Sequence, residues 1–144
     1  MNENIDIERL TYAISVAHLE TFIAELPLGA YTKIGNSGAG ISGGQKQRIL
    51  IARAVYKDPH YIFFDEATSS LDATSESIIM HNLSKFFLRK TVLIIAHRMS
   101  TVKNADQIIV LENGKVEEIG RHETLIKQKG KYYELVKNQL ELGV

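Results

Sequence analysis

Three polar residues of this 144-residue sequence stand directly after short apolar runs. Asp65 and Glu66 follow the run 61–64, and His97 follows the run 91–96. At the end of a strand, Asp65 can hold a hard cation such as Mg²⁺, and Glu66 can polarise a nucleophilic water. His97 can donate a hydrogen bond to a phosphate or orient that water. The alternative is that the carboxylates cap the next helix and that His97 is an ordinary loop residue.

A second group of residues with chemical potential lies at 41–45, before a predicted helix. Ser42 with Gln45 three residues later is the pattern of a capping box, and Gly43 and Gly44 leave the first backbone N–H groups uncovered. Such a helix start binds anions through free donors and the helix dipole. The alternative is a plain helix cap after a flexible loop. We read the basic residues of this helix as a solvated face: Lys46, Arg48, Arg53 and Lys57.

The elements that must position the first group can be read from apolar patterning. The runs 61–64 and 91–96 are continuously apolar, as expected of strands that are buried on both faces. Residues 75–88 leave room for a crossover helix, so the three segments predict a βαβ unit with a parallel pair. Ligands bind outside the carboxyl ends of parallel strands, which places the three polar residues at one edge of the sheet.

Helical segments are predicted before this unit. Residues 6–26 carry apolar positions at helical spacing and read as an interrupted helix capped by Asp6. Residues 45–57 read as a second helix, which ends at Asp58 because the residue before Pro59 disfavours helical backbone.

A hairpin and two more helices are predicted after it. Asn113-Gly114 lies between two apolar runs and is typical of a tight hairpin turn. The end of the chain reads as two helices, 123–128 and 132–142, with Gly130 as the break.

Composition limits the classes of function. The chain is 44% hydrophobic and 24% charged, which predicts one globular domain or a part of one. Lys and Arg number 17, as do Asp and Glu, so the charge balance gives no argument for nucleic acid as a partner. The absence of Cys excludes a disulfide framework and thiolate chemistry. No apolar run approaches the roughly 20 residues of a membrane span.

Three segments resemble motifs of ATP-binding cassette (ABC) proteins in order and spacing. ISGGQKQRILIARA at 41–54 resembles the signature motif, YIFFDEATSSLD at 61–72 the Walker B motif with the D-loop, and IIAHRMSTV at 94–102 the H-loop. The flanks ELPLGAYTKIG at 25–35 and GKYYELVKNQLELG at 130–143 look most like bacterial peptidase-containing exporters, which secrete leader-bearing peptides such as bacteriocins.

The resemblance implies a fold. It is an α/β fold, the C-terminal part of a P-loop NTPase domain of the ABC type, lacking the Walker A half. A helical subdomain with the signature motif, 1–58, is followed at 59–144 by a parallel βαβ core, a β-hairpin and C-terminal helices.

The resemblance also implies roles for single residues of the Walker B and H-loop segments. Asp65 matches the aspartate associated with Mg²⁺, and Glu66 matches the catalytic glutamate that polarises the attacking water. His97 matches the switch histidine that contacts the γ-phosphate of ATP.

The signature and D-loop residues have implied roles at a shared site. Ser42, Gly43, Gly44 and Gln45 match the signature, which in the family reaches the γ-phosphate of a nucleotide held mainly by the opposite subunit. Asp72 matches the D-loop aspartate at the interface between the two sites.

The family's cofactors and partners follow from the same resemblance. They are ATP and Mg²⁺, a second nucleotide-binding domain in a head-to-tail dimer, the transmembrane domains of an exporter, and a segment that supplies Walker A, with no nucleic acid. The expected location is the cytoplasmic face of the bacterial plasma membrane. Because no G-x-x-x-x-G-K-[ST] pattern occurs in this sequence, the chain by itself is expected to bind MgATP weakly and not to hydrolyse it.

Three hypotheses result. The first is the ATPase part of an exporter that couples ATP hydrolysis to transmembrane export of a peptide or other substrate. The second is a truncated remnant without catalysis of its own, which acts at most as a docking module. The third, a DNA-repair or chromosome-maintenance cassette protein, is disfavoured because the sequence has neither heptads nor Cys.

Overall fold

The computed structural model describes residues 5–34, 40–65, 67–68, 70–95 and 102–141. Contacts between Cα atoms divide the chain into two compact units, Met1–Leu93 and Ile94–Val144, and each is described by itself. The helices of the first unit are α1 (Ile7–Val16), α2 (Glu20–Glu25), the short 3-10 helix η1 (Gly29–Tyr31), α3 (Gly43–Lys57) and α4 (Ala73–Phe86). The division at residue 58 expected from the sequence stays a prediction.

The N-terminal segment forms an interrupted helix, as predicted. The Asp6 side chain accepts a hydrogen bond from the Arg9 backbone N–H at 3.0 Å and caps α1. Between α1 and α2, His18 adopts a left-handed backbone with φ 54°, which ends the first helix before the second begins. Helix α1 packs against α3 and also contacts α4.

Helix α3 carries the signature segment at its N-terminus. It ends where the sequence predicted, and Asp58 takes a left-handed conformation with φ 50° as its C-cap. The apolar residues Ile51 and Val55 are buried, which anchors this helix in the core of the first unit. Because α3 is packed in this core, the position of its N-terminal turn is fixed.

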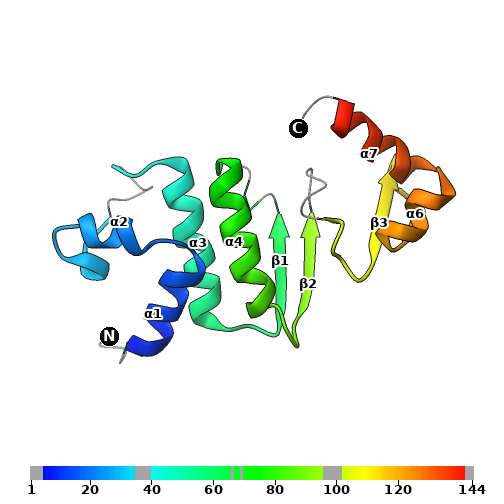
Figure 1. The fold of residues 1–144 in the computed structure, drawn as a ribbon. Helices are drawn as coiled ribbons and strands as arrows, with labels where there is room; N and C mark the ends of the chain where they lie inside the picture. The colour runs from blue at the N-terminus through cyan, green and yellow to red at the C-terminus, as the bar shows by residue number, and fades with distance from the viewer. Residues whose placement is uncertain (1–4, 35–39, 66, 69, 96–101, 142–144) are drawn as a thin grey trace. The chain divides into compact units, whose positions relative to one another are not determined.

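A βαβ unit follows. Strand β1 (Tyr61–Asp65), helix α4 and strand β2 (Thr91–Ile95) succeed one another along the chain, and the two strands form one sheet. Both strands run in the same direction, with α4 as the crossover helix (Figure 1). The predicted parallel pair is confirmed.

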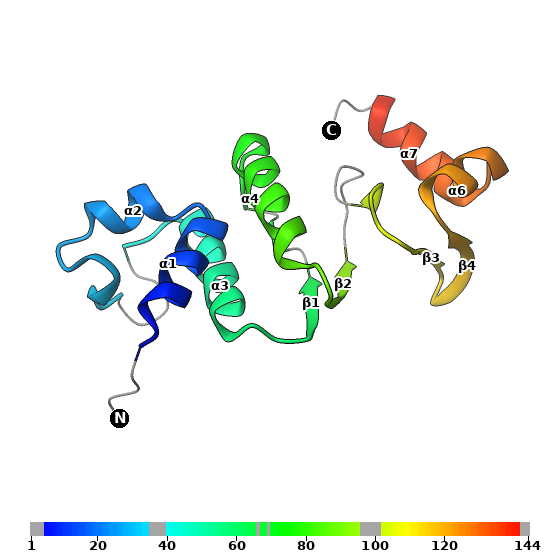
Figure 2. The ribbon, with the colours of Figure 1, turned by 60° about the horizontal axis from the view of Figure 1, so that its bottom comes forward.

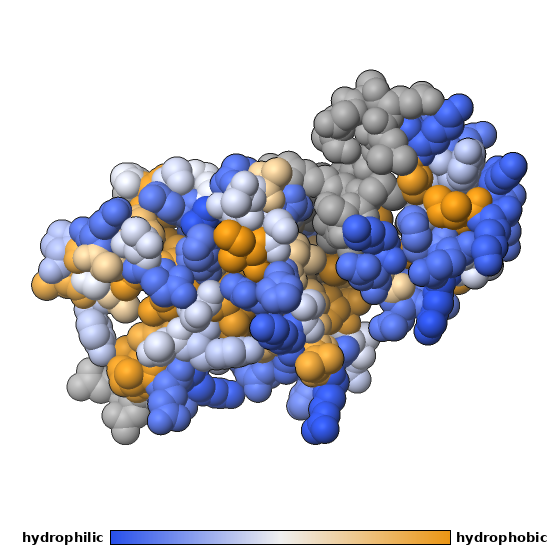
Figure 3. Space-filling model, viewed as in Figure 1, coloured by the Kyte–Doolittle hydropathy of each residue, from blue (hydrophilic) through white to orange (hydrophobic). Residues whose placement is uncertain are grey.

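The prediction that these strands are buried on both faces is wrong for this chain. Ile62 and Phe64 are buried, whereas the side chains that alternate with them, Tyr61 and Phe63, are 71% and 77% exposed. Phe64 meets Phe87, at the end of α4, edge-to-face with ring centroids 5.6 Å apart. The crossover helix thus covers one face of the strand, and alternation places every second side chain on the other. Figure 3 shows apolar residues reaching the surface among hydrophilic ones.

The second unit is a hairpin with two helices. Strands β3 (Ile108–Glu112) and β4 (Lys115–Gly120) are antiparallel, and helices α6 (His122–Gln128) and α7 (Lys131–Glu141) follow. Asn113 and Gly114 have φ angles of 51° and 75°, the left-handed pair that a two-residue hairpin turn requires. Figure 2 shows both strands with α6 and α7 beside them. The core of this unit comprises Ile108, Val110, Leu125 and Tyr132.

Gly130 directly precedes α7, and a carboxylate from β4 caps this helix. The Gly130 carbonyl accepts a hydrogen bond from the Glu134 N–H, so Gly130 occupies the N-cap position without a side chain to cap the helix. The Glu118 carboxylate on β4 takes that role, accepting hydrogen bonds from the backbone N–H groups of Lys131 at 3.1 Å and Tyr132 at 2.8 Å. A Cβ at position 130 would lie 1.7 Å from Glu118 Oε1, so only glycine admits this approach.

Candidate functional site

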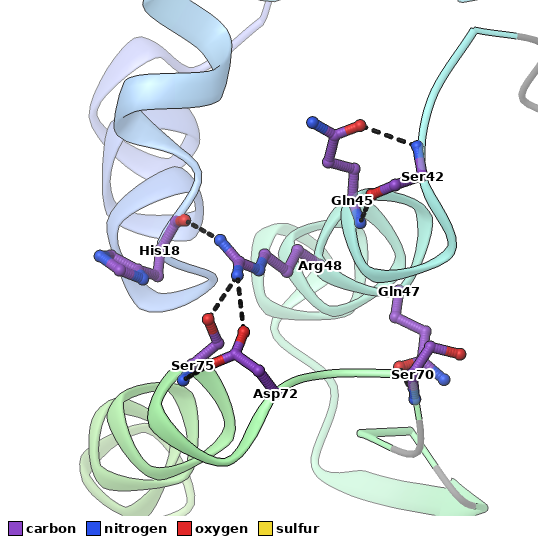
Figure 4. Close-up of polar contacts among 8 residues, drawn as sticks. All are labelled: His18, Ser42, Gln45, Gln47, Arg48, Ser70, Asp72 and Ser75. Atoms are coloured by element: carbon purple, nitrogen blue, oxygen red, sulfur yellow. Dashed lines mark hydrogen bonds and ion pairs between the residues drawn. The ribbon is translucent and has the colours of Figure 1, made fainter.

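The start of α3 is a complete capping box. The Ser42 hydroxyl accepts a hydrogen bond from the Gln45 backbone N–H at 3.1 Å, and the Gln45 side-chain oxygen accepts one from the Ser42 N–H at 2.8 Å (Figure 4). This confirms the capping pattern read from the sequence. The reciprocal bonds fix the backbone at the point where the signature segment enters the helix.

The two signature glycines pack against the segment that follows β1. A Cβ on Gly43 would lie 3.6 Å from the Ser70 Cβ, and a Cβ on Gly44 would lie 3.3 Å from the Ser70 carbonyl oxygen and 3.5 Å from a Leu71 methyl carbon. A side chain at position 44 would therefore crowd the Ser70 carbonyl, whereas a Cβ at position 43 would make ordinary van der Waals contact with Ser70. The structure thus brings the predicted signature and the predicted D-loop into direct contact.

Asp72 has a structural role at the start of α4. Its carboxylate accepts a hydrogen bond from the Ser75 backbone N–H at 2.9 Å and caps the helix, while its side chain stays 66% exposed. Hydrogen bonding to Ser75, and to a smaller extent the charge of Arg48, holds the pKa of the Asp72 carboxyl below its usual value. A cap does not conflict with the predicted place of Asp72 at an interface, which stays a prediction.

Gln47 and Arg48 connect α3 with the segment 70–75. The sequence pattern gave neither residue an individual role. The Gln47 side-chain oxygen accepts a hydrogen bond from the Ser70 N–H at 3.0 Å. Arg48 donates to the Ser75 hydroxyl at 2.6 Å and to the His18 carbonyl at 3.2 Å (Figure 4).

The interpretation of Arg48 as part of a solvated face is wrong. Its side chain is only 21% exposed, whereas Arg53 and Lys57 on the same helix are exposed. Helical spacing carries the missing signal, because Arg48 lies three residues before Ile51 and seven before Val55, the buried stripe of α3.

The predicted metal and catalytic residues are described only in part. Asp65 is the last residue of β1, and its side chain is exposed. Glu66 and His97 lie outside the described residues. Across the described ranges, no group of three or more His, Asp or Glu side chains is placed to hold a metal ion.

The start of α3 also places backbone N–H groups at the positive end of the helix dipole. The first N–H groups of an α-helix have no partner within the helix. Here the Ser42 hydroxyl and carbonyl take the N–H groups of Gln45 and Lys46. Among the described residues, the structure gives no acceptor for the N–H groups of Gly43 and Gly44, which lie in the first turn of a 15-residue helix, where the dipole favours negative charge.

No helix within the described part of the chain has the length and apolar character needed to cross a membrane.

Comparisons with known proteins give the family. The family described as "ABC transporter" matches residues 1–69. The leukotoxin export ATP-binding protein LtxB of Aggregatibacter actinomycetemcomitans is 52% identical over 132 residues, 91% of this chain and 19% of that protein. The alpha-hemolysin translocation ATP-binding protein HlyB of Escherichia coli is 51% identical over 132 residues, with 92% of this chain and 19% of that protein covered.

A solved structure agrees. A bacterial Atm1-family ABC exporter with ATP bound matches 96% of this chain and 24% of its own, with a TM-score of 0.89 and 37% sequence identity. The chain therefore spans about a fifth of the length of the curated relatives that it matches, since 19% of each is covered. Sequence, motif order and fold agree that the chain belongs to the ABC transporter family.

Proposed function

We propose that the chain is the part of an exporter ATPase that carries the signature and Walker B motifs, and that it serves to couple ATP hydrolysis to transmembrane export. The observation that carries the proposal is the contact of the capped start of α3 with the segment 70–72, which gathers the signature and D-loop residues at one place. The names of the relatives concern export of leukotoxin and translocation of alpha-hemolysin, which favours a protein toxin as the substrate class. Export of a peptide such as a bacteriocin, the narrower substrate class expected from the sequence, stays a prediction.

The start of α3 fits the terminal phosphate of ATP. Gly43 and Gly44 are the first two residues of α3 and offer backbone N–H groups to an anion, and Ser42 precedes them as the N-cap. Gln45 stabilises this arrangement through the capping box. We assign these four residues to a nucleotide held mainly by a second nucleotide-binding domain in a head-to-tail dimer, with Asp72 at the interface.

The end of β1 fits the metal of the nucleotide. Asp65 presents an exposed carboxylate, the oxygen donor that Mg²⁺ prefers. When bound, Mg²⁺ neutralises charge on the phosphates. We assign Asp65 to that ion, Glu66 to polarising the attacking water, and His97 to the γ-phosphate.

The partners complete the site. The Walker A loop, which contributes backbone donors and a lysine to the triphosphate in P-loop proteins, has no counterpart in this sequence and comes from another segment. Transmembrane domains supply the transport path, so we place the chain at the cytoplasmic face of a bacterial plasma membrane through those partners.

A chimera tests the proposal. This chain replaces the matching segment of LtxB, to which it is 52% identical. ATP hydrolysis by the chimera is expected, and Glu66→Gln in it should retain ATP binding while abolishing turnover, because the substituted side chain no longer accepts the proton of the attacking water. The control is Glu117→Gln, a substitution of an exposed carboxylate on β4.

Two results would contradict these assignments. Full turnover in the Glu66→Gln chimera would remove the role given to Glu66. A folded chimera that binds no ATP, beside active LtxB, would favour the alternative of a docking module without catalysis.

A further inference from the structure

Two adjacent residues of α3 hold both ends of the segment 70–75. Gln47 accepts a hydrogen bond from the Ser70 N–H at 3.0 Å, at the beginning of the segment. Arg48 donates to the Ser75 hydroxyl at 2.6 Å and lies 4.0 Å from the Asp72 carboxylate, at its end. Figure 4 shows both side chains reaching from α3 to this segment.

The Arg48 guanidinium serves more than one element at once. Besides its contacts at the start of α4, it donates to the His18 carbonyl at 3.2 Å, in the left-handed turn between α1 and α2. Its Nε is buried and has no hydrogen-bond partner among the described residues. The planar guanidinium group carries several N–H donors in fixed directions and can reach these separate acceptors at once, whereas the single ammonium group of a lysine cannot.

The glycine contacts add a steric constraint on the same segment. Gly43 and Gly44 lie against Ser70 and Leu71 closely enough that added side chains would meet them. The close approach of the glycines, the hydrogen bond from the Ser70 N–H to Gln47 and the ion pair of Arg48 with Asp72 therefore fix the segment 70–72 against the helix start. The predicted signature and the predicted D-loop therefore pack against each other.

We propose that Gln47 and Arg48 are positioning residues, which set the D-loop segment 70–72 relative to the signature start and so align both for a nucleotide shared with a partner domain. The proposal rests on the proposed function. Neither residue needs to touch ATP in this role, because each acts through the segment that it holds. A displacement of catalytic parts by about 1 Å is enough to slow chemistry by two orders of magnitude.

The first experiment measures how strongly Gln47 protects the Ser70 amide, in the unsubstituted chain and in variants at position 47. Amide hydrogen exchange is followed by NMR for Ser70 and, as a reference, for the core residues Ile62 and Leu83. Gln47→Met should speed exchange of the Ser70 amide about five-fold, the equivalent of one net hydrogen bond, and leave the core amides unchanged. Gln47→Glu keeps an acceptor and should restore the slow exchange.

The second experiment measures the consequence in the LtxB chimera. Arg48→Lys should lower kcat about ten-fold or more, with the KM for ATP unchanged within about two-fold, because alignment and not binding is lost. Arg53→Lys is the matched control, since Arg53 is an exposed arginine of the same helix, and it should leave kcat unchanged.

The outcomes separate the two proposals. Unchanged Ser70 exchange in Gln47→Met, or an equal kcat for Arg48→Lys and Arg53→Lys, would overturn the positioning role. An unsubstituted chimera without ATP hydrolysis would overturn the proposed function instead, and the exchange measurement then decides the positioning of the segment by itself.

Discussion

Replacing Gly130 by alanine tests how the second unit is held together. The added Cβ would lie 1.7 Å from Glu118 Oε1, so the Glu118 carboxylate must leave its place. Its departure breaks the hydrogen bonds to the N–H groups of Lys131 and Tyr132. The φ angle of Gly130 lies outside the left-handed region, so backbone strain adds nothing to the effect.

The magnitude follows from the lost cap. Removing a helix N-cap costs about 1 kcal/mol, and each hydrogen bond to a charged acceptor contributes roughly 1.5–3 kcal/mol when it is buried. Glu118 is only partly buried, and water replaces part of the lost bonding. We therefore expect Gly130→Ala to lower the free energy of unfolding of this unit by about 1–2 kcal/mol.

The assay is amide exchange in α7, supported by urea unfolding followed by circular dichroism. A double-mutant cycle with Glu118→Ala supplies the control. Once the carboxylate is absent, Gly130→Ala has nothing to displace and should cost only the smaller preference of an N-cap for glycine over alanine, about 0.5 kcal/mol. An equal cost of Gly130→Ala in both backgrounds would refute the reasoning, as would unchanged exchange at the Tyr132 amide.

Other consequences can be measured on the same chain. Ser42→Ala removes the cap of α3 and should lower the free energy of unfolding by about 1 kcal/mol, with faster exchange at the Gln45 amide. Gly114→Ala places a side chain at φ 75° and should cost about 1–2 kcal/mol, seen as a lower urea midpoint. The hydrogen bond from Lys90 lowers the pKa of Asp58 in the folded chain. The contribution of this bond to the free energy of unfolding is therefore present above the pKa of the unfolded chain, and it is lost as the pH falls through the lowered pKa of the folded chain. Urea unfolding should therefore show Lys90→Met less stable by at most about 1 kcal/mol near neutral pH, with the difference shrinking below about pH 4. Calorimetric titration of the chain alone with MgATP should show weak binding, and tight saturable binding would contradict that expectation.

Much of the fold was predictable because its signals are local. Asp6, the pair of Ser42 and Gln45, and the turn Asn113-Gly114 each satisfy or shape the backbone within a few residues. Capping and turn chemistry of this kind depends on residue type and short spacing, so the sequence indicates it directly. The order and spacing of the motifs are also properties of the sequence alone, and they indicated the family that the fold and the relatives confirm.

The candidate site was predictable as a set of residues but not as a set of contacts. The pattern at 42–45 predicted a capping box at a helix start, and the structure has it. Nothing local indicated that the start packs on Ser70 and Leu71, since the two parts lie far apart along the chain. The roles of Glu66 and His97 remain predictions.

The partners of the charged and apolar side chains depend on segments that are distant in the sequence. Arg48 belongs by type to a solvated face, but its position beside Ile51 and the approach of α4 give it a half-enclosed place with several acceptors. Tyr61 and Phe63 belong by type to a core, but the crossover helix covers only the opposite face of β1. Sequence alone determines which groups seek burial, a cap or a partner, because those preferences belong to the residue and its neighbours. Which partner each group finds depends on segments brought together by folding, and that is decided by packing.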